Sequence, residues 1–467
     1  MTQRREVTPA PGLLEAFAQE FDPLFTKWNQ REGFRRYLEG LLLPAERNKT
    51  LTGLANTAPG TGAQEARAQS LQWFLSESNW DEAAVNERRR AVLRRAPNTA
   101  PNAEGVLVID ETGDVKTGTH TAHVGRQYLG SVGKIDNGVV SVSSLWANEQ
   151  VYYPLDVIPY TPAGWFARGQ RDPAFQTKLT IAVELVKQAV AGHWPFKAVV
   201  ADSFYGEDAT VRGSLQQLEV GYVLALKPSH SWWHAQNEPG SLDEVARATP
   251  WRATKPGAWQ AVERVFRDGH RERWWALEIK VGPYGPQRRE RALVVTTDPP
   301  TLPELSTWYL ATNLPVKNRP RAARGPRRGA SVAEVVRLYG LRMWVEQSYK
   351  QVKTTLGWAQ YQVRSSRAMQ RHWLLIYCAF TFCWWQAVQT ASSEDWVGDP
   401  ALALVTAHST VQVKGEKKSG RHAGFANPIV AQRAQASSQL AGTGDYAQAL
   451  LAGLFIGAPS TCAARAT

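Results

Sequence analysis

Apolar residues recur at spacings of three and four along most of residues 1–100. Leu13, Phe17 and Phe21 lie at this spacing, which places side chains on one face of a helix. The alternation of apolar and polar residues that is typical of strands is absent here. Prolines and asparagines follow at 96–102 and are typical of a linker. We therefore predict a helical N-terminal domain over 1–100.

Short apolar runs separated by glycine-rich and polar turns come next, and this texture is typical of strands. The runs at 197–201 and 222–226 are continuously apolar, as in strands buried in a sheet, and a helical pattern at 176–193 precedes them. We predict an α/β core whose first part spans 101–227, with a three-strand meander as the simplest arrangement of its first strands. Those strands are expected at 106–109, 126–131 and 139–146.

Residues 228–330 carry further strand patterns, and we predict a β-rich insertion there. Its tryptophans suit packing in a core or in cross-strand pairs of a hairpin. They are Trp232, Trp233, Trp251, Trp259, Trp274 and Trp275. Strands are expected at 261–266, 274–281, 291–297 and 307–312.

Helical patterns return over 331–395 and are assigned to the core. The most apolar run, 373–385, has about 13 residues, whereas a membrane span needs roughly 18 to 20, so we interpret it as a buried helix. Residues 396–467 are rich in Ala, Gly, Ser and basic residues, which favours a partly disordered C-terminal tail. No apolar stretch follows the basic residues at the N-terminus, so we expect no signal peptide.

The charge balance points to a class of partner. The chain has 54 Lys and Arg against 42 Asp and Glu, a formal net charge of +12, and a pI near 9.6. This excess favours a polyanionic partner, with nucleic acid first. Cys378, Cys383 and Cys462 show no metal-ligand spacing, so we expect free thiols in a reducing compartment.

Two aspartates follow apolar runs at corresponding places. Asp110 comes after 106–109, and Asp202 comes after the run that ends at Ala201. Open α/β sheets keep their sites at the carboxyl ends of strands, so we expect both carboxylates at one edge of the sheet, facing each other. The alternative for either residue is a helix N-cap or a turn.

Five polar residues are expected to share one face of a predicted helix, at offsets of 0, 3, 7, 11 and 14. At about 100° per residue they span an arc of roughly 80°. An apolar stripe lies about a quarter turn away, so one face packs and its neighbour is available for chemistry. The alternative is a solvated face with an internal Glu346–Lys350 pair. The five residues are Tyr339, Arg342, Glu346, Lys350 and Lys353.

Asp110, Asp202 and Glu346 together suit phosphoryl transfer. Mg²⁺ prefers oxygen ligands and keeps positions open for water and phosphate oxygens, and Mn²⁺ can substitute. Two such ions clamp the attacking and leaving oxygens at phosphorus. We therefore predict these three acids as catalytic metal ligands. The DNA contacts predicted beside them are Tyr339, Arg342, Lys350 and Lys353.

A run of basic residues without any acidic residue stands just before the acidic helix. Contact with the DNA backbone fits it, and a solvated loop is the alternative. The run comprises Lys317, Arg319, Arg321, Arg324, Arg327 and Arg328. His120 and His123 lack further ligands to complete a metal site, and the glycines of 125–133 do not match a phosphate-binding loop.

These residues resemble a known family. The spacing of Tyr339, Arg342, Glu346 and Lys353 is similar to the Tyr-Arg-Glu-Lys signature of DDE-superfamily insertion-sequence transposases. The segments Val-Ile-Asp-Glu-Thr-Gly and Val-Ala-Asp-Ser-Phe-Tyr-Gly around the two aspartates resemble the aspartate motifs of the same enzymes, in the same order. The resemblance spans about 20–390.

One position departs from the family pattern. Glu111 stands where relatives often carry a second Asp directly after the catalytic one. The metal ligand proper is Asp110, so we expect the change to be tolerated.

The resemblance implies a ribonuclease H-like catalytic core with the β-rich insertion before its acidic helix, and an N-terminal domain that binds element ends. It also gives the tryptophans of the insertion an alternative role, stacking on a flipped DNA base. It implies a bacterial cut-and-paste transposase that cleaves double-stranded DNA at element ends and joins them to target DNA. A homodimer in the DNA complex, at the nucleoid in the cytoplasm, is expected from this function. Two alternatives stay open: a DNA-binding descendant that no longer cuts, and a metal-dependent nuclease without strand transfer.

Overall fold

The structure, a computed structural model, describes residues 12–43, 47–233, 239–266, 269–279, 290–317 and 327–390. Contacts within the chain divide it into two units, which are considered separately. The first comprises Met1–Thr99, Gln351–Gln362 and Arg371–Thr467, and the second comprises Ala100–Lys350 and Val363–Gln370. The predicted C-terminal tail, 396–467, lies outside the described residues.

The described part of the first unit is helical, as its apolar spacing predicts. Arg371 is fully buried there, and its guanidinium donates to the Glu82 carboxylate at 2.6 Å and to the carbonyls of Leu75 and Trp80, each at 3.1 Å. A buried charge needs such partners, so this network fixes the last helix against the N-terminal ones. The helices are α1 (Gly12–Gln19), α2 (Trp28–Leu42), α3 (Leu51–Leu54), α4 (Ala66–Gln72), α5 (Glu82–Arg95) and, from Arg371 on, α12 (Ser366–Thr390).

Helix α12 contains the most apolar run of the chain, and almost every side chain of 373–385 is buried, as predicted. No helix among the described residues is long and apolar enough to cross a membrane. Cys378 and Cys383 on this helix are free and buried, and burial raises the pKa of each thiol to about 12. Cys462 lies outside the described residues.

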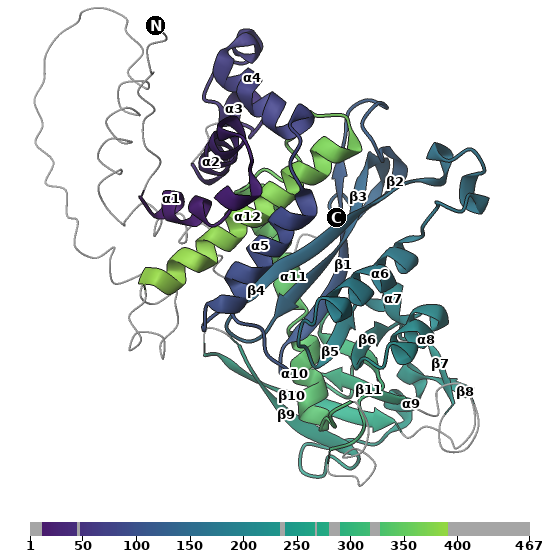
Figure 1. The fold of residues 1–467 in the computed structure, drawn as a ribbon. Coiled ribbons are helices and arrows are strands. Elements are labelled where there is room, and N and C mark those ends of the chain that lie inside the picture. Colours follow the sequence, from purple (N-terminus) through teal and green to yellow (C-terminus); the bar gives the residue numbers. More distant parts are fainter. Residues whose placement is uncertain are drawn as a thin grey trace, which may run out of the picture. The chain divides into compact units, whose positions relative to one another are not determined.

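The second unit is built on one large mixed sheet in the order β2-β3-β1-β5-β6-β12-β11-β10-β9, with β4 paired to β3 (Figure 1). Strands β1, β5 and β6 are parallel, and the other pairings are antiparallel. The predicted α/β class is confirmed, and the sheet with its helices is consistent with a ribonuclease H-like core. The strands are β1 (Val106–Val115), β2 (Gly125–Leu129), β3 (Lys134–Ala147), β4 (Tyr152–Tyr160), β5 (Ala198–Ala201), β6 (Tyr222–Leu226), β9 (Trp259–Val265), β10 (Arg271–Ile279), β11 (Arg291–Thr296) and β12 (Thr307–Thr312). A separate pair consists of β7 (Ser231–Trp233) and β8 (Pro239–Ser241).

The predicted three-strand meander is wrong in its order. β3 returns beside β1 and pairs with it from Val106↔Ala147 to Val115↔Gly138, while β2 pairs only with the start of β3. The reason is burial, because β3 is buried continuously from Gly138 onward and such a strand belongs inside a sheet. The sequence patterns did not predict β4, because Pro154 and Pro159 count against a central strand. Within the described residues β4 lies beside β3 and pairs with it from Tyr152 to Tyr160.

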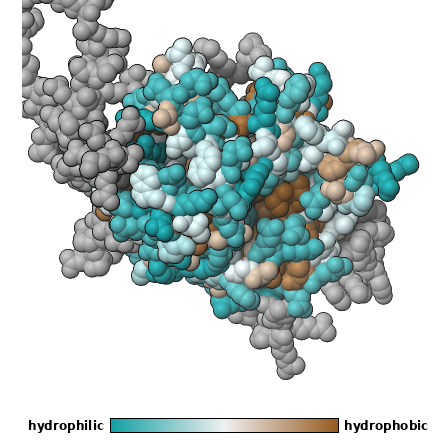
Figure 2. Space-filling view, turned by 45° about the horizontal axis from the view of Figure 1, so that its top comes forward, coloured by the Kyte–Doolittle hydropathy of each residue, from teal (hydrophilic) through white to brown (hydrophobic). Residues whose placement is uncertain are grey.

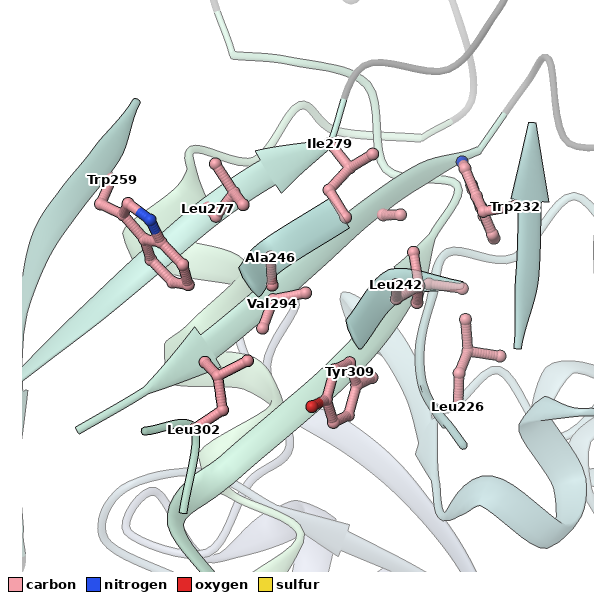
Figure 3. Close-up of a cluster of buried hydrophobic side chains, with 12 residues drawn as sticks. Leu226, Trp232, Leu242, Ala246, Trp259, Leu277, Ile279, Val294, Leu302 and Tyr309 are labelled. Atoms are coloured by element: carbon pink, nitrogen blue, oxygen red, sulfur yellow. The ribbon is translucent and has the colours of Figure 1, made fainter. Parts of the chain in front are cut away.

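The strands predicted as an insertion continue the main sheet, because β12 pairs with β6 through Tyr309↔Leu226. One face of these strands and α9 (Leu242–Ala248) enclose an apolar cluster (Figure 3). Trp232 and Trp259 lie in it, 0% and 2% exposed, so core packing accounts for these two tryptophans. Trp251 and Trp275 pack against the same cluster.

Helices cover the rest of the sheet. Sheet residues and apolar side chains of α6 and α8 line one small cavity, so these two helices pack on the sheet. Hydrophilic residues cover most of the face drawn in Figure 2, with hydrophobic residues showing between them. The helices of this unit are α6 (Lys178–Ala191), α7 (Ser203–Gly206), α8 (Ala209–Gln217), α9, α10 (Val332–Gly340) and α11 (Met343–Thr354), the last of which runs on into the first unit.

Gly206 at the end of α7 allows the helix to approach β6 closely. A Cβ added there would lie 1.8 Å from the carbonyl oxygen of Ala225, which is backbone and cannot yield cheaply. We expect Gly206→Ala to lower the free energy of unfolding by about 2 kcal/mol or more, measured by urea denaturation.

Gly213 on α8 is the matched control, because no described atom lies within 4 Å of a Cβ added there. Gly213→Ala should stabilise the protein by up to about 1 kcal/mol through helix propensity. If the two substitutions changed the free energy of unfolding equally, the close approach of α7 to β6 would not require glycine at position 206.

Candidate active site

Asp110 lies on β1 and is 7% exposed. The prediction that the strand ends at this residue is wrong, because β1 continues to Val115 by pairing with β3. The parallel pairing of β1 with β5, however, stops at Val108↔Val200. Asp110 therefore stands just beyond the parallel segment, where β1 and β5 are no longer paired. One of its oxygens, Oδ1, accepts from the Glu111 amide at 2.8 Å.

Asp202 follows β5 directly and caps α7. Its Oδ1 accepts from the Phe204 amide at 3.0 Å, and its backbone is extended, as a helix N-cap requires. Asp202 therefore caps the helix and also lies in the site, because its other oxygen, Oδ2, is 4.0 Å from Nη2 of Arg342. Capping fixes the orientation of the carboxylate toward that guanidinium.

The prediction of one continuous helix through the polar residues is wrong. α10 ends at Gly340 and α11 begins at Met343, with the Arg342 amide donating to the Tyr339 carbonyl at 3.0 Å in the turn between them. Gly340 favours the break, since glycine has low helix propensity. Tyr339 is thus on α10, Arg342 in the junction and Glu346 on α11. The predicted apolar stripe is nevertheless buried throughout: Leu338, Leu341, Val345, Val352 and Leu356.

The three predicted acids converge on the guanidinium of Arg342. Its Nη2 lies 3.1 Å from Oδ2 of Asp110, and its Nη1 lies 3.0 Å from Oε1 of Glu346. With the Asp202 contact at 4.0 Å, one cation touches all three carboxylates. The side chain of Glu346 is 65% exposed and that of Asp110 is 10% exposed, so the site opens to solvent on the α11 side.

Burial and charge oppose each other at Asp110. Burial raises the pKa of this carboxyl to about 7, the neighbouring Arg342 lowers it, and the like charge of Asp202 raises it. Burial alone would lower the pKa of Arg342, but Asp110 and the other acids hold it above its ordinary range. The guanidinium therefore compensates only part of the negative charge gathered here.

The donor set suits a divalent ion, although its present arrangement centres on Arg342. Within the described ranges no three His, Cys, Asp or Glu side chains are grouped to hold a metal ion. The three acids offer carboxylate oxygens, the ligands that Mg²⁺ and Mn²⁺ prefer. Burial raises the pKa of Asp110 more than Arg342 lowers it, so further positive charge would favour its carboxylate form. Asp110, Asp202 and Glu346 are thus the residues that fit a metal.

The predicted DNA contacts occupy several positions. Tyr339 is half-buried, its ring meets Trp308 edge-on at 5.0 Å, and burial raises its pKa to about 12. On α11, Lys350 is exposed and Lys353 is half-buried. Tyr339 and Arg342 therefore belong to the immediate surroundings of the acids.

Half of the predicted basic run can be placed. Lys317 and Arg328 are exposed, and Arg327 is half-buried. Arg328 lies 3.2 Å from Glu104, an ion pair that a phosphate would have to replace or join. The remaining members, Arg319, Arg321 and Arg324, lie outside the described residues.

Two pairs near the site went unnoticed in the sequence. Lys178, the first residue of α6, contacts Glu111 at 2.8 Å and lies 5.8 Å from the Phe204 ring centroid. The hydroxyl of Tyr349 on α11 lies 2.7 Å from that of Ser143 on β3. A single lysine or tyrosine forms no repeated spacing from which its contact could be predicted. The acidic Glu111 beside Asp110 was the one residue of these pairs whose charge indicated a basic partner.

His123 forms hydrogen bonds with two hydroxyl groups. Its ring nitrogens lie 2.6 Å from the Thr161 hydroxyl and 2.7 Å from the Ser366 hydroxyl. Burial lowers its pKa to about 4, so the ring is neutral and joins three chain segments by hydrogen bonds.

Known proteins are similar to this chain in sequence. A family model described as DDE superfamily endonuclease matches residues 20–279, which include Asp110 and Asp202 and end before Glu346. The chain is also 31% identical over 364 residues to a probable transposase for insertion sequence element IS701 of Microchaete diplosiphon, covering 78% of this chain and 85% of that protein. The resemblance to insertion-sequence transposases is thereby confirmed, and the chain belongs to the DDE superfamily of endonucleases.

Proposed function

We propose that this chain is a transposase that cleaves DNA at the ends of its insertion element and joins them to target DNA by two-metal phosphoryl transfer. The observation that carries the proposal is the convergence of Asp110, Asp202 and Glu346 on one guanidinium, in a chain of the DDE superfamily. The relative from Microchaete diplosiphon is named as a transposase, which supports the same reading.

The three acids would hold the metal ions, with Mg²⁺ as the native ion and Mn²⁺ as a substitute. When bound, such ions supply an activated oxygen nucleophile and stabilise the leaving oxygen at phosphorus. The chain itself provides fixed carboxylates, because α7 capping orients Asp202 and the amide of Glu111 holds one oxygen of Asp110. Glu346, on the exposed side, is the ligand with the most freedom to move.

Arg342 has two tasks in this proposal. Without DNA it compensates part of the negative charge of the acids, and with DNA its planar fork pairs with a phosphate next to them. Tyr339 stands beside it on α10 and offers a hydroxyl that burial keeps protonated. Lys350 and Lys353, together with the basic run from Lys317 to Arg328, extend positive charge along the DNA backbone.

Double-stranded DNA is the partner in this reading, bound as element ends and as target. The helical N-terminal domain binds the ends, and two copies of the chain pair them as a homodimer. Light scattering of the DNA complex tests this assembly, and a strictly monomeric complex would count against it.

Two other functions make different demands on the same residues. A DNA-binding protein that no longer cuts would need none of the three acids, yet all three meet at one place. A metal-dependent nuclease without strand transfer would cut but fail to join, and a joining assay separates it from a transposase.

Glu346→Gln removes a proposed metal ligand and keeps the size of the side chain. We expect the intact protein to cut a labelled duplex carrying its element's end with Mg²⁺ or Mn²⁺, and the variant to lose at least about a hundredfold in rate while still binding. This magnitude is typical for loss of transition-state charge stabilisation.

Glu184→Gln on α6 is the control, because the Glu184 side chain is 40% exposed and its contacts with Lys187 at 4.0 Å and Gln188 at 3.5 Å are both long. It should cut like the intact protein. Binding without cutting by the intact protein would favour the silent DNA-binding protein, and equal cutting by Glu346→Gln would assign the metal to other residues.

Asp110→Asn tests the charge state of the site without metal. The pKa of Asp110 is raised from 3.8 to about 7, so the folded chain binds this proton more tightly than the unfolded chain does. Stability is therefore lost as pH rises from about 4 to about 7, and the neutral Asn escapes that loss. At about 1.4 kcal/mol per pKa unit, the variant gains at most about 4 kcal/mol relative to the intact protein by pH 7 and levels off above it.

Urea denaturation in EDTA, followed by tryptophan fluorescence from pH 4 to 8, measures this difference. Asp136→Asn is the control, because hydrogen bonding from the Asn137 amide and Lys134 lower the pKa of Asp136, so this variant cannot gain stability relative to the intact protein as pH rises. Parallel stability curves for Asp110→Asn and the intact protein would show that Asp110 ionises normally.

A further inference from the structure

Arg264 on β9 is held by aromatic rings instead of by an acid. Its guanidinium carbon lies 4.5 Å from the ring centroids of Trp274 and Trp308 and 4.7 Å from that of Phe266. The two tryptophan rings also touch each other, with centroids 4.7 Å apart. Three rings therefore fix the plane of one guanidinium.

The guanidinium of Arg264 has one acid nearby, Glu272, which stands opposite Arg264 in the pairing of β9 with β10. No hydrogen bond or ion pair joins Arg264 to a described residue, although Glu272 on β10 attracts it at longer range. Arginine stays charged at neutral pH and has five N–H donors, so these donors face either water or a ligand. Arg264 is half-buried, which leaves one side open.

The aromatic face around Arg264 is the one turned toward the signature residues. Successive strand residues point to opposite faces, so Trp274 and Trp308 lie opposite to Trp275 and Tyr309, which belong with the apolar cluster. On the Trp274 face, a Cβ added at Gly340 would lie 3.4 Å from Nη2 of Arg264. A larger residue than glycine would cover the guanidinium.

A chain of contacts leads from Arg264 to the catalytic acids. The ring of Trp308 meets that of Tyr339 at 5.0 Å, and the Tyr339 phenol is close enough to Arg342, Asp202 and Asp110 to feel their charges. A polyanionic strand that reaches the acids therefore passes beside a fixed positive charge with unused donors.

We propose that Arg264 binds a backbone phosphate of the DNA strand that enters the active site, with the aromatic rings serving to hold its planar fork in place. The inference rests on the proposed function for the identity of the strand. A phosphate suits the site because a guanidinium pairs with it through two parallel hydrogen bonds.

The experiment measures binding of a fluorescein-labelled duplex carrying the element's end, in the Glu346→Gln background, over a series of NaCl concentrations. Each phosphate contact contributes about 0.9 to the slope of log affinity against log salt. Arg264→Gln should reduce that slope by about one and weaken binding about tenfold at low salt. Arg264→Lys keeps the charge without the planar stacking and should retain most of the slope.

Arg271→Gln is the matched control, since Arg271 on the neighbouring strand is 65% exposed and pairs with Glu263. It should leave the slope near that of the parent. A folded Arg264→Gln protein with an unchanged slope would overturn the proposal and leave Arg264 as a support for the aromatic rings.

A second measurement changes the DNA instead of the protein, by removing the charge of one phosphate at a time. Single neutral methylphosphonates replace one phosphate at a time along the strand. At one position the replacement should lower the affinity of the parent protein for the duplex about tenfold. The same replacement should leave the affinity of the Arg264→Gln variant for the duplex unchanged, because the contact is already lost. Positions that weaken neither protein, or both equally, would reject the proposal. DNA bound in this way but never cut with metal would instead reject only the transposase mechanism.

Discussion

Three carboxylates gathered at one edge of a sheet repel one another, and the rest of the site is arranged around the single cation that allows this. Arg342 contacts Asp110, Asp202 and Glu346, yet burial still leaves the pKa of Asp110 near 7. Like charges in a half-buried place are costly unless opposite charge approaches. The site is therefore short of positive charge, which is the condition under which a divalent ion binds most favourably.

The sheet that carries this edge also carries the strands that follow the core in sequence. Since β12 pairs with β6, the strands β9 to β12 share one hydrogen-bonded framework with β1 and β5. One face of this extension is filled by the apolar cluster, and the opposite face carries Arg264 and its rings. The same frame thus holds both the carboxylates and a second cationic position at fixed register.

The sequence predicted those features that depend on local patterns. Continuous apolar runs located β5 and β6, and the position of Asp202 directly after β5 followed from them. The order of β1 to β3 was not predictable in this way, because it depends on which strand is buried on both sides. The break at Leu341 and Arg342 was missed for a related reason, since the apolar stripe around it keeps a helical period although the helix does not continue.

Contacts between distant residues were beyond reach of the sequence. Lys178 and Glu111 are far apart in the chain, and neither belongs to a periodic pattern. The same holds for Arg264, whose aromatic partners lie on β10, on β12 and just after β9. A glycine at position 340 leaves room beside its guanidinium. Apolar runs, helical spacing and the resemblance to a family predicted the three acids, whereas the residues around the acids could be identified only from the fold.

The junction between α10 and α11 bears on how such chains tolerate insertions and deletions. One residue added within α11 before Glu346 would rotate that side chain by about 100° and shift it by about 1.5 Å, away from Asp110 and Asp202. The same addition between α11 and α12, beyond Thr354, would leave the acids in register. Length variation among homologous chains should therefore be absent between Tyr339 and Glu346 and be found in the connections on either side.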